Sequence, residues 1–366
     1  MTRRLWISLT VLSFCPLFAA RMSAQQTGAA EVSTVTFTGF EAPNAGTGAN
    51  QGTSPVSINR SGVIAGWYVD AQNVQHGFVR ATDGTITSFD PRGAARTFPQ
   101  NINTTGAIVG FFLDAGNVSH GFARVASGTI SRFNAPGAGS GAYQGTFIFA
   151  INARGTFVGT FVDAGGVSHG FMRTTNGVWT VFDAPGAGSG SGQGTIAFSI
   201  NTAGTTTGYY IDASSVYHGF VRSPDGTMTQ FDLPGPIYNF PADIDSAGTI
   251  AGYYIDQAGV FHGFVRDPGG AITTIDAPGA GTGANQGSQG NSINTAGAIA
   301  GFYVDANNVH HGFVRSADGA ISTFNAPGAG TAANQGTLVF RINAAGAMTG
   351  EYIDASNVAH GFLRTP

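Results

Sequence analysis

Histidine and aspartate recur along the sequence in a fixed arrangement that could bind metal ions or relay protons. Seven of the eight histidines open the tripeptide His-Gly-Phe, and an aspartate stands six residues before each of them. The histidines are His76, His120, His169, His218, His262, His311 and His360, and the aspartates are Asp70, Asp114, Asp163, Asp212, Asp256, Asp305 and Asp354. Imidazole and carboxylate groups are usual zinc ligands, and calcium takes six to eight oxygen ligands at one point.

The elements that carry these residues favour a structural role. Each aspartate opens a short turn between two strand-like segments, where its side chain can accept hydrogen bonds from the backbone. If Asp70 opens such a turn, then Tyr68 faces His76 and Gly66 faces Phe78 across the hairpin. We therefore expect each aspartate to cap its own turn and each histidine to stack on an aromatic ring. Separate hairpins cannot share one zinc ion, so we predict no metal site, with calcium binding by the aspartates as the alternative.

Arginine also recurs, ten residues after each of these aspartates. The set comprises Arg80, Arg124, Arg173, Arg222, Arg266, Arg315 and Arg364. We interpret these arginines as contacts between neighbouring units, with anion binding as the alternative.

The spacing of the motifs identifies an internal repeat. Successive His-Gly-Phe tripeptides lie 44, 49, 49, 44, 49 and 49 residues apart. In the fourth repeat, turn motifs separate four strand-like segments at 195–200, 205–211, 216–221 and 227–231. A four-stranded sheet cannot bury both of its faces alone, so neighbouring sheets must stack. The sequence predicts an all-β fold, a seven-bladed β-propeller of four-stranded antiparallel blades. An open β-solenoid is the alternative.

The phase of the repeats predicts how the two ends of the fold meet. The first repeated segment, 34–41, is the strand that precedes a linker, and the last repeat stops after its His-Gly-Phe strand. The last blade therefore lacks a fourth strand. We predict that residues 32–41 pair with residues 358–364, so that the N-terminal strand completes the last blade and closes the ring.

Composition supports a globular, turn-rich chain. Of the 366 residues 56 are glycine, 42% are hydrophobic and only 10% are charged. Glycine at this density disfavours helices. All 16 basic residues are arginine and the net charge is −4, so the chain offers no basic face for nucleic acid.

The N-terminal segment has the features of a secretory signal. Arg3 and Arg4 precede the apolar run 5–20, which is too short for a comfortable membrane span. We predict a signal peptide over 1–24, a single seven-repeat β-propeller domain over 25–366, and no membrane span. The protein would then be secreted, either extracellular or at the cell surface. The only cysteine, Cys15, lies within the predicted signal.

The repeated motifs resemble those of a known class of bacterial proteins. His-Gly-Phe-x-Arg, the Asp-Gly turn that follows it, and the Ile-Asn-x-x-Gly-x-Ile-x-Gly-x-Tyr stretch are similar to the HAF-type extracellular repeat proteins. The resemblance covers nearly the whole of the mature chain. Glycine replaces the central alanine of the HAF motif, and the tryptophan that usually follows the aromatic residue is missing. The resemblance implies secretion and a repeated β-architecture, and it carries no established activity.

The linkers between repeats supply the candidate ligand-binding residues. Propeller ligands commonly bind the face formed by these linkers and by the middle turns, which join the second and third strands of each repeat. Five linkers end in Gln-Gly followed by Thr or Ser. Their glutamines could bind sugar hydroxyls or brace the linker itself. These residues are Gln51, Gln144, Gln193, Gln286 and Gln335.

The two shorter linkers differ from the other five and supply the remaining candidates. One contains Arg92, Arg96 and Phe98, and the other leads into Tyr238 and Phe240. Aromatic rings beside an arginine suit a ligand site at the rim. The alternative is that these side chains fill the space left by a shorter loop.

Catalysis is not expected, because no nucleophile motif is present and acid–base catalysis needs converging carboxylates. The non-repeated acids Asp243, Asp245 and Glu351 would have to meet in the central channel to support a hydrolase or lyase. We predict a secreted, monomeric binding module without cofactor, whose partner is a glycan such as a polysaccharide, a cell-envelope component or a surface protein. A structural surface or matrix protein is the alternative.

Overall fold

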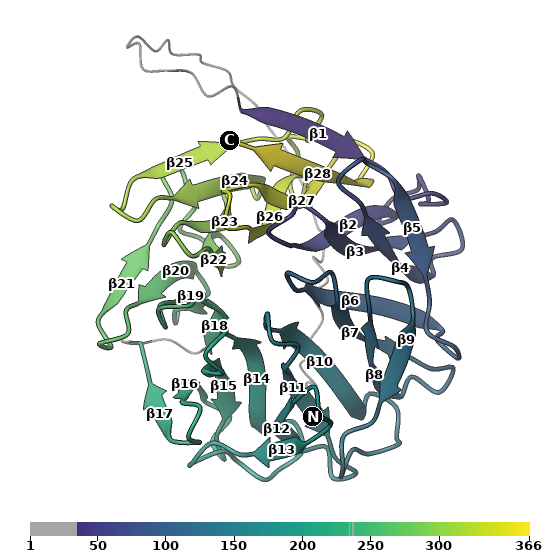
Figure 1. Ribbon diagram of the computed structural model, residues 1–366. Coiled ribbons are helices and arrows are strands. Elements are labelled where there is room, and N and C mark those ends of the chain that lie inside the picture. The colour runs from purple at the N-terminus through teal and green to yellow at the C-terminus, as the bar shows by residue number, and fades with distance from the viewer. Residues whose placement is uncertain (1–34, 234, 236–237) are drawn as a thin grey trace.

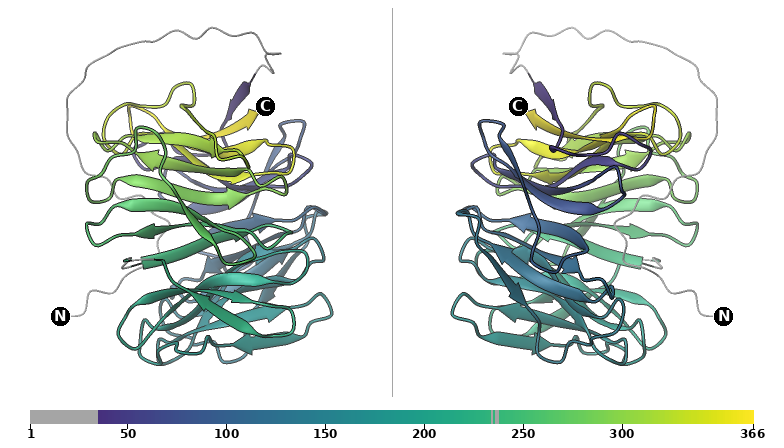
Figure 2. Two further views of the ribbon diagram at one scale, coloured as in Figure 1. Left: turned by 90° about the vertical axis from the view of Figure 1, so that its left-hand side faces the viewer. Right: turned by 90° about the vertical axis from the view of Figure 1, so that its right-hand side faces the viewer.

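The computed structural model describes residues 35–233, 235 and 238–366, and these residues form an all-β structure. The predicted signal peptide 1–24 and residues 32–34 of the predicted N-terminal strand lie outside the described residues. Figure 1 shows groups of strands arranged around a central opening, with the first strand of each repeat innermost and the fourth outermost. Figure 2 shows the same groups from the two sides, where they lie one above another as tilted layers.

Six repeats fold into an antiparallel meander in which four strands follow one another, and the seventh supplies the first three strands of such a meander. The first strands are β2 (Gly52–Ile58), β6 (Arg96–Ile102), β10 (Gly145–Ile151), β14 (Gly194–Ile200), β18 (Tyr238–Ile244), β22 (Gly287–Ile293) and β26 (Gly336–Ile342). The second strands are β3 (Ile64–Val69), β7 (Ile108–Leu113), β11 (Phe157–Val162), β15 (Thr206–Ile211), β19 (Ile250–Ile255), β23 (Ile299–Val304) and β27 (Met348–Ile353). The third strands are β4 (Gln75–Arg80), β8 (Ser119–Arg124), β12 (Ser168–Arg173), β16 (Tyr217–Arg222), β20 (Phe261–Arg266), β24 (His310–Arg315) and β28 (Ala359–Thr365). The fourth strands are β5 (Ile86–Phe89), β9 (Ile130–Phe133), β13 (Trp179–Phe182), β17 (Met228–Phe231), β21 (Ile272–Ile275) and β25 (Ile321–Phe324).

The first described strand, β1 (Thr36–Phe40), takes the place of a fourth strand beside β28. It runs antiparallel to β28, with Thr36 opposite Thr365 and Phe40 opposite Gly361. The predicted pairing of the N-terminal and C-terminal strands is therefore confirmed for the described residues. We number the repeats 1 to 7 from β2 to β26, so that β1 belongs with repeat 7.

The hairpin register agrees with the sequence prediction. Tyr68 lies opposite His76 and Gly66 opposite Phe78. The two rings of Tyr68 and His76 stack with centroids 5.1 Å apart, and every other repeat has the corresponding stack at 4.8–5.0 Å. A Cβ added to Gly66 would meet the carbonyl oxygen of Ser54 at 2.3 Å, which explains why glycine stands opposite the phenylalanine.

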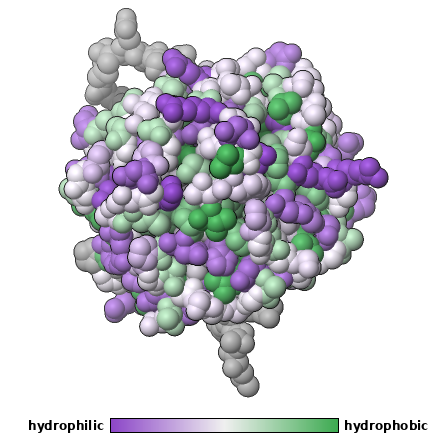
Figure 3. Space-filling model, turned by 60° about the horizontal axis from the view of Figure 1, so that its bottom comes forward, coloured by the Kyte–Doolittle hydropathy of each residue, from purple (hydrophilic) through white to green (hydrophobic). Residues whose placement is uncertain are grey.

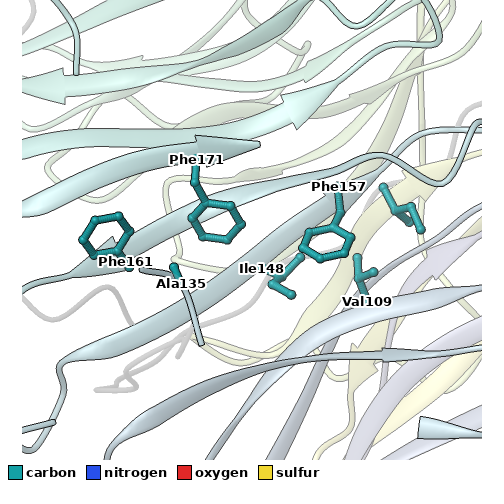
Figure 4. Packing of buried hydrophobic residues seen from close by; sticks show 7 residues of the cluster. Val109, Ala135, Ile148, Phe157, Phe161 and Phe171 are labelled. Carbon is teal, nitrogen blue, oxygen red and sulfur yellow. The ribbon is translucent and has the colours of Figure 1, made fainter. Parts of the chain in front are cut away.

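The hydrophobic core lies between neighbouring repeats. The phenylalanine of every His-Gly-Phe is at most 1% exposed. In one cluster, Val109 of repeat 2 packs with Ile148, Phe157 and Phe171 of repeat 3. Figure 4 shows the ring of Phe157 beside Ile148 and Val109, with Phe161 at the other end of the cluster. Because each sheet shares its core with the next, one repeat has no complete core of its own.

Six of the seven repeated arginines join neighbouring repeats through aromatic rings. The guanidinium carbon of Arg80 lies 4.9 Å from the ring centroid of Phe40, which belongs to β1. The equivalent contact links Arg124 to Phe89 at 5.1 Å and Arg222 to Phe182 at 4.7 Å. A guanidinium over an aromatic face stabilises by about 0.5–2 kcal/mol. The interpretation of these arginines as contacts between units is thereby supported.

Candidate functional site

A cavity of about 540 Å³ opens on the central axis, at the end where the first strand of each repeat turns into the second. Every repeat contributes the last two residues of its first strand and the first two of its turn. The lining stretches are 57–60, 101–104, 150–153, 199–202, 243–246, 292–295 and 341–344. Cavities of this size commonly hold small molecules. The cavity lies at the opposite end of the strands from the linkers.

The residue at the first lining position varies among the repeats. In repeat 5 it is Asp243, and the residues at the same position in three other repeats donate hydrogen bonds to its carboxylate. Asp243 Oδ2 accepts from Arg341 Nη1 at 2.8 Å, Ser292 Oγ at 2.9 Å and the Ile293 amide at 3.2 Å. Asp243 Oδ1 accepts from Ser199 Oγ at 2.9 Å and from the Ile244 amide at 3.1 Å. The carboxylate of Asp243 is thus saturated by donors from repeats 4 to 7.

Arg341 extends this network across the axis. With the amide of Asn101 turned so that its oxygen faces the guanidinium, Arg341 Nη2 donates to it at 2.9 Å. The side chains of Arg341 and Asp243 are each 14% exposed, so their charges are largely withdrawn from water. The pair forms a polar floor between repeats 2, 5 and 7. A carboxylate that neutralises an arginine and accepts five hydrogen bonds has its oxygens engaged within the protein.

The third lining position forms a second network, which we call the asparagine chain. The side-chain oxygen of Asn59 accepts from the amides of Ser61 and Val63 in its own turn, and its Nδ2 donates to the carbonyl of Asn103. The same side-chain-to-carbonyl bond, 3.0–3.2 Å long, recurs in six repeats. The chain runs through Asn294, Asn343, Asn59, Asn103, Asn152 and Asn201, and it ends on the carbonyl of Asp245.

The opposite end of the strands holds the linkers, where the predicted glutamines are engaged in internal hydrogen bonds. Gln51 Oε1 accepts from the Gly48 amide at 2.9 Å, and Gln51 Nε2 donates to Asn73 Oδ1 at 3.0 Å. Gln144 and Gln193 make the same linker bond and donate to the middle-turn carbonyls of Ala164 and Ala213. Gln286 and Gln335 repeat the pattern. The arrangement supports the linker-bracing role of the five amides.

Five junctions between repeats carry a backbone bridge, and we call them linked junctions. In each, the glycine after the linker glutamine pairs in parallel with the first residue of the preceding third strand. The pairs are Gly52–Ala359, Gly145–Ser119, Gly194–Ser168, Gly287–Phe261 and Gly336–His310. The φ angle of Gly194 is +111°, and a Cβ there would lie 2.0 Å from the Ser168 carbonyl oxygen. Only glycine permits this approach.

The two junctions behind the short linkers lack this bridge among the described residues, and we call them unlinked junctions. The glycine position is occupied by Arg96 between repeats 1 and 2 and by Tyr238 between repeats 4 and 5. As a result the strands form two hydrogen-bonded sheets, of 16 and 12 strands, which separate at these two junctions. Gln75 Oε1, at the junction with Arg96, is buried and has no hydrogen-bond partner among the described residues.

Half-buried aromatic rings gather at both unlinked junctions. Phe98 lies 6.3 Å from Trp67 and 5.0 Å from Phe111, measured between ring centroids. At the other junction, Tyr238 meets Tyr217 at 4.8 Å, and Phe240 meets Tyr209, Tyr217 and Tyr253 at 5.0–5.7 Å. Arg92 and Arg96 precede Phe98 along the chain and are exposed. The structure therefore places the predicted residues of the short linkers in two separate aromatic groups.

Comparison with known proteins identifies the architecture. No protein-family model matches the chain, and no curated protein matches its sequence. Among solved structures, the chain is similar to the BP39L lectin from Burkholderia pseudomallei, with a TM-score of 0.54 and 10% identity over 83% of this chain and 93% of that one. It is also similar to a prolyl endopeptidase, with a TM-score of 0.50 and 9% identity over 87% of this chain and 46% of that one. The fold is a β-propeller.

A third similar structure is TolB from Acinetobacter baumannii, with a TM-score of 0.48 and 12% identity over 74% of this chain. The match spans 62% of the TolB chain. At these identities the likenesses concern the fold of the propeller alone.

The repeated histidines of the propeller have partners that the sequence analysis missed. His76 Nδ1 lies 2.7 Å from Asp90 Oδ2, and its Nε2 lies 3.3 Å from Asp70 Oδ2. Burial acts to lower the pKa of His76, but the bonds to Asp90 and Asp70 outweigh it and raise the pKa. In repeats 2 and 6 the residue equivalent to Asp90 is Asn134 or Asn325. In the sequence, the acid or amide that directly follows each fourth strand could have indicated this partner.

The repeated aspartates cap their turns as predicted. Asp70 Oδ1 accepts from the amides of Gln72 and Val74 at 2.8 Å, and these bonds lower the pKa of Asp70. Among the described residues, no group of three or more histidine, cysteine or acidic side chains is placed to hold a metal ion. The same part of the chain contains no helix long and apolar enough to cross a membrane.

The three non-repeated acids of the propeller do not come together. Asp243 and Asp245 line the axial cavity, whereas Glu351 is outside its lining and lies in β27. Ser54 Oγ donates to Glu351 Oε2 across the junction of repeats 7 and 1. Burial raises the pKa of Glu351 to about 7, and the bond from Ser54 partly opposes this shift.

None of the ten predicted ligand-binding residues lines the axial cavity. The signal that could have located the cavity is a position at which the repeats disagree. The residues there are Ser57, Asn101, Ala150, Ser199, Asp243, Ser292 and Arg341, whereas the position two residues later is almost constant. A position that varies within an otherwise regular repeat indicates that its side chain no longer serves the structural role that the repeats share.

Proposed function

We propose that this protein is a secreted, monomeric seven-bladed β-propeller that binds a glycan at its unlinked junctions and has no catalytic activity. The β1–β28 pairing supports a ring closed by the N-terminal strand, and so does the bond from Asn343 Nδ2 to the Asn59 carbonyl at 3.0 Å. The HAF-type resemblance supports the extracellular location. The fold suits this role, since a lectin is among the similar structures.

The observation that carries the proposal is the replacement of the bridging glycine by Arg96 and Tyr238. At the linked junctions, the backbone N–H and C=O groups that a ligand could bind are already hydrogen-bonded between the repeats. The junction of repeats 1 and 2 carries Phe98 and the exposed Arg96, and there the Gln75 side-chain oxygen has no hydrogen-bond partner among the described residues. Aromatic faces that stack on sugar rings, together with a few placed polar groups, are what glycan recognition requires.

The exterior of the protein is consistent with a monomer. Figure 3 shows a face on which small green patches are separated by purple and pale areas. The large apolar side chains that are exposed are Val35, Val125, Tyr143, Val178, Val181 and Val216. Single exposed apolar residues of this kind need no partner subunit to cover them.

The test is a binding screen of residues 25–366 on immobilised bacterial and plant polysaccharides, with calcium and with a chelator. We expect at least one polysaccharide to bind equally under both conditions. The variants Arg96→Gly and Tyr238→Gly restore the glycine of the other repeats and should weaken binding, as should Phe240→Ala. Tyr143→Ala, at a linked junction, is the control and should bind normally.

Two outcomes would contradict the proposal. One is a screen without any binding, which would favour a protein partner or a structural role. The other is full binding by all three junction variants. A loss of binding on calcium removal would instead assign the repeated aspartates a metal-binding role.

A further inference from the structure

The asparagine chain is interrupted once, between repeats 5 and 6. Repeat 5 has Asp245 where the other repeats have asparagine, and a carboxylate cannot donate to the next carbonyl. Asn294 should receive that bond, but among the described residues its carbonyl accepts only from the Gly297 amide of its own turn, at 3.0 Å. We call the space between the Asp245 side chain and the Asn294 carbonyl the carboxylate gap. Both residues line the axial cavity.

The backbone around Asp245 is the same as in the other repeats. Its Oδ1 accepts from the amides of Ala247 and Thr249, and its carbonyl accepts from Asn201 Nδ2 at 3.0 Å. Since Oδ1 occupies the position of an asparagine oxygen, Oδ2 occupies the position of the missing amide nitrogen. Asp245 is 8% exposed, and Oδ2 has no hydrogen-bond partner among the described residues. An acceptor on the cavity lining therefore faces another acceptor across the gap.

Asp245 also has no ion-pair partner within 4.0 Å among the described residues. The one arginine–acid pair found within 4.0 Å among the described residues joins Arg341 to Asp243. That pair is mutually neutral, so the floor of the cavity does not compensate Asp245. A cationic donor at the gap would give this carboxylate a charge-assisted hydrogen bond.

We propose that the carboxylate gap is the binding site for a small ligand that presents a primary ammonium group to the axial cavity. An ammonium has three N–H donors, enough to bond Asp245 Oδ2 and the Asn294 carbonyl together. A calcium ion would need six to eight oxygen ligands, and the gap supplies two of this kind. The site is at the opposite end of the strands from the junctions of the proposed function, and it does not depend on that function.

The experiment compares glucosamine with N-acetylglucosamine, whose rings are alike but of which only the first carries an ammonium. Binding to the protein is measured by NMR titration near neutral pH. Hydrogen bonds to charged groups are stronger than neutral ones, so glucosamine should bind at least about tenfold more tightly. Asp245→Asn should remove this preference. Because it completes the asparagine chain, this variant should also unfold at the same temperature as the wild type or higher.

Two controls separate the gap from general charge effects and from the linker end. Asp318→Asn makes the same charge change on an exposed turn and should keep the preference for glucosamine. Phe240→Ala should keep it as well, even if polysaccharide binding is lost. Equal binding of the two sugars by the wild type, or an unchanged preference in folded Asp245→Asn, would overturn the proposal. In both cases water would be the occupant of the gap.

Discussion

The linked and unlinked junctions are built from the same repeat but hold their neighbours in different ways. At the linked junction of repeats 3 and 4, the Ser168 amide donates to the Gln193 carbonyl and the Gly192 amide donates to the Gly166 carbonyl, both at 2.8 Å. At the unlinked junctions, aromatic packing takes the place of these bonds. The bridging position is glycine at every linked junction and Arg96 or Tyr238 at the two unlinked ones, where side chains join the adjacent sheets.

The largest effect is expected from Gly194→Val, which should break a linked junction. The new Cβ would lie 2.0 Å from the Ser168 carbonyl oxygen, and the residue would have to keep φ near +111°. Strained backbone and steric overlap together should lower the free energy of unfolding by about 3 kcal/mol or more. Urea denaturation of the two proteins measures this difference. A loss below about 1 kcal/mol would mean that the bridge is dispensable.

The next effect concerns the floor of the cavity, which joins repeats 4 and 5 across an unlinked junction. Asp243→Asn would leave Arg341 without its carboxylate while both positions remain largely buried. Breaking a fully buried pair costs about 3–5 kcal/mol, so we expect about 2–3 kcal/mol at this partly exposed site. The double variant Asp243→Asn, Arg341→Met should recover part of the loss in urea denaturation. If Asp243→Asn unfolds with the same free energy as the wild type, the other contacts of Ser199 and Tyr238 hold the junction without the ion pair.

Glu351 makes the linked junction of repeats 7 and 1 sensitive to pH. Its pKa rises from 4.5 to about 7 on folding, so the folded state binds the proton more tightly than the unfolded chain. Stability should therefore fall as pH rises from about 4.5 to about 7, by about 2–3 kcal/mol from this group. Glu351→Gln should remove this part of the slope when unfolding is followed at several pH values. Parallel pH profiles for the two proteins would contradict the expectation.

A smaller effect should follow from closing an unlinked junction with Arg96→Gly. The glycine could then approach β4 as the other bridging glycines approach their third strands. We expect the free energy of unfolding to change by less than about 1 kcal/mol, because the new bonds offset the entropy lost by glycine. Hydrogen exchange is the sharper measurement, and the Gln75 amide should become more protected. Unaltered exchange at Gln75 would show that linker length also prevents the bridge.

The smallest effect concerns the surface histidines. Asp90→Asn gives repeat 1 the amide that repeats 2 and 6 have naturally. Losing this acid should lower the pKa of His76 in an NMR titration, because Asp90 is the main group that raises it. Stability linked to His76 is present below its unfolded pKa of 6.5 and is lost as pH rises through the raised folded value. A higher pKa of His76 in the variant would contradict this explanation.

Local rules predicted the hairpins because each hairpin is specified by neighbouring residues. The register of Tyr68 and His76 follows from the turn at Asp70, and the same is true in every repeat. The prediction of the strand that completes repeat 7 depended only on the phase of the repeat. The seven-blade count and the closed ring remain part of the proposal.

Contacts between distant repeats could not be predicted in the same way. The Asp243–Arg341 pair joins residues from repeats 5 and 7, and the axial cavity requires a known arrangement around the axis. The bridging glycine was noticed as part of Gln-Gly, but its role depends on the backbone of the preceding repeat. The glutamine was the more conspicuous residue, and its amide braces the linker.

The pairing of β1 with β28 has a consequence for the order of folding. His360 Nδ1 lies 2.5 Å from Glu41 Oε1, although 319 residues separate them along the chain. The ribosome makes β1 before any repeat, yet β1 can find its partner only after β28 has been synthesised. Contacts of such large sequence separation form slowly, and unpaired strands are exposed to aggregation meanwhile. β1 is therefore made before the repeats and placed after them.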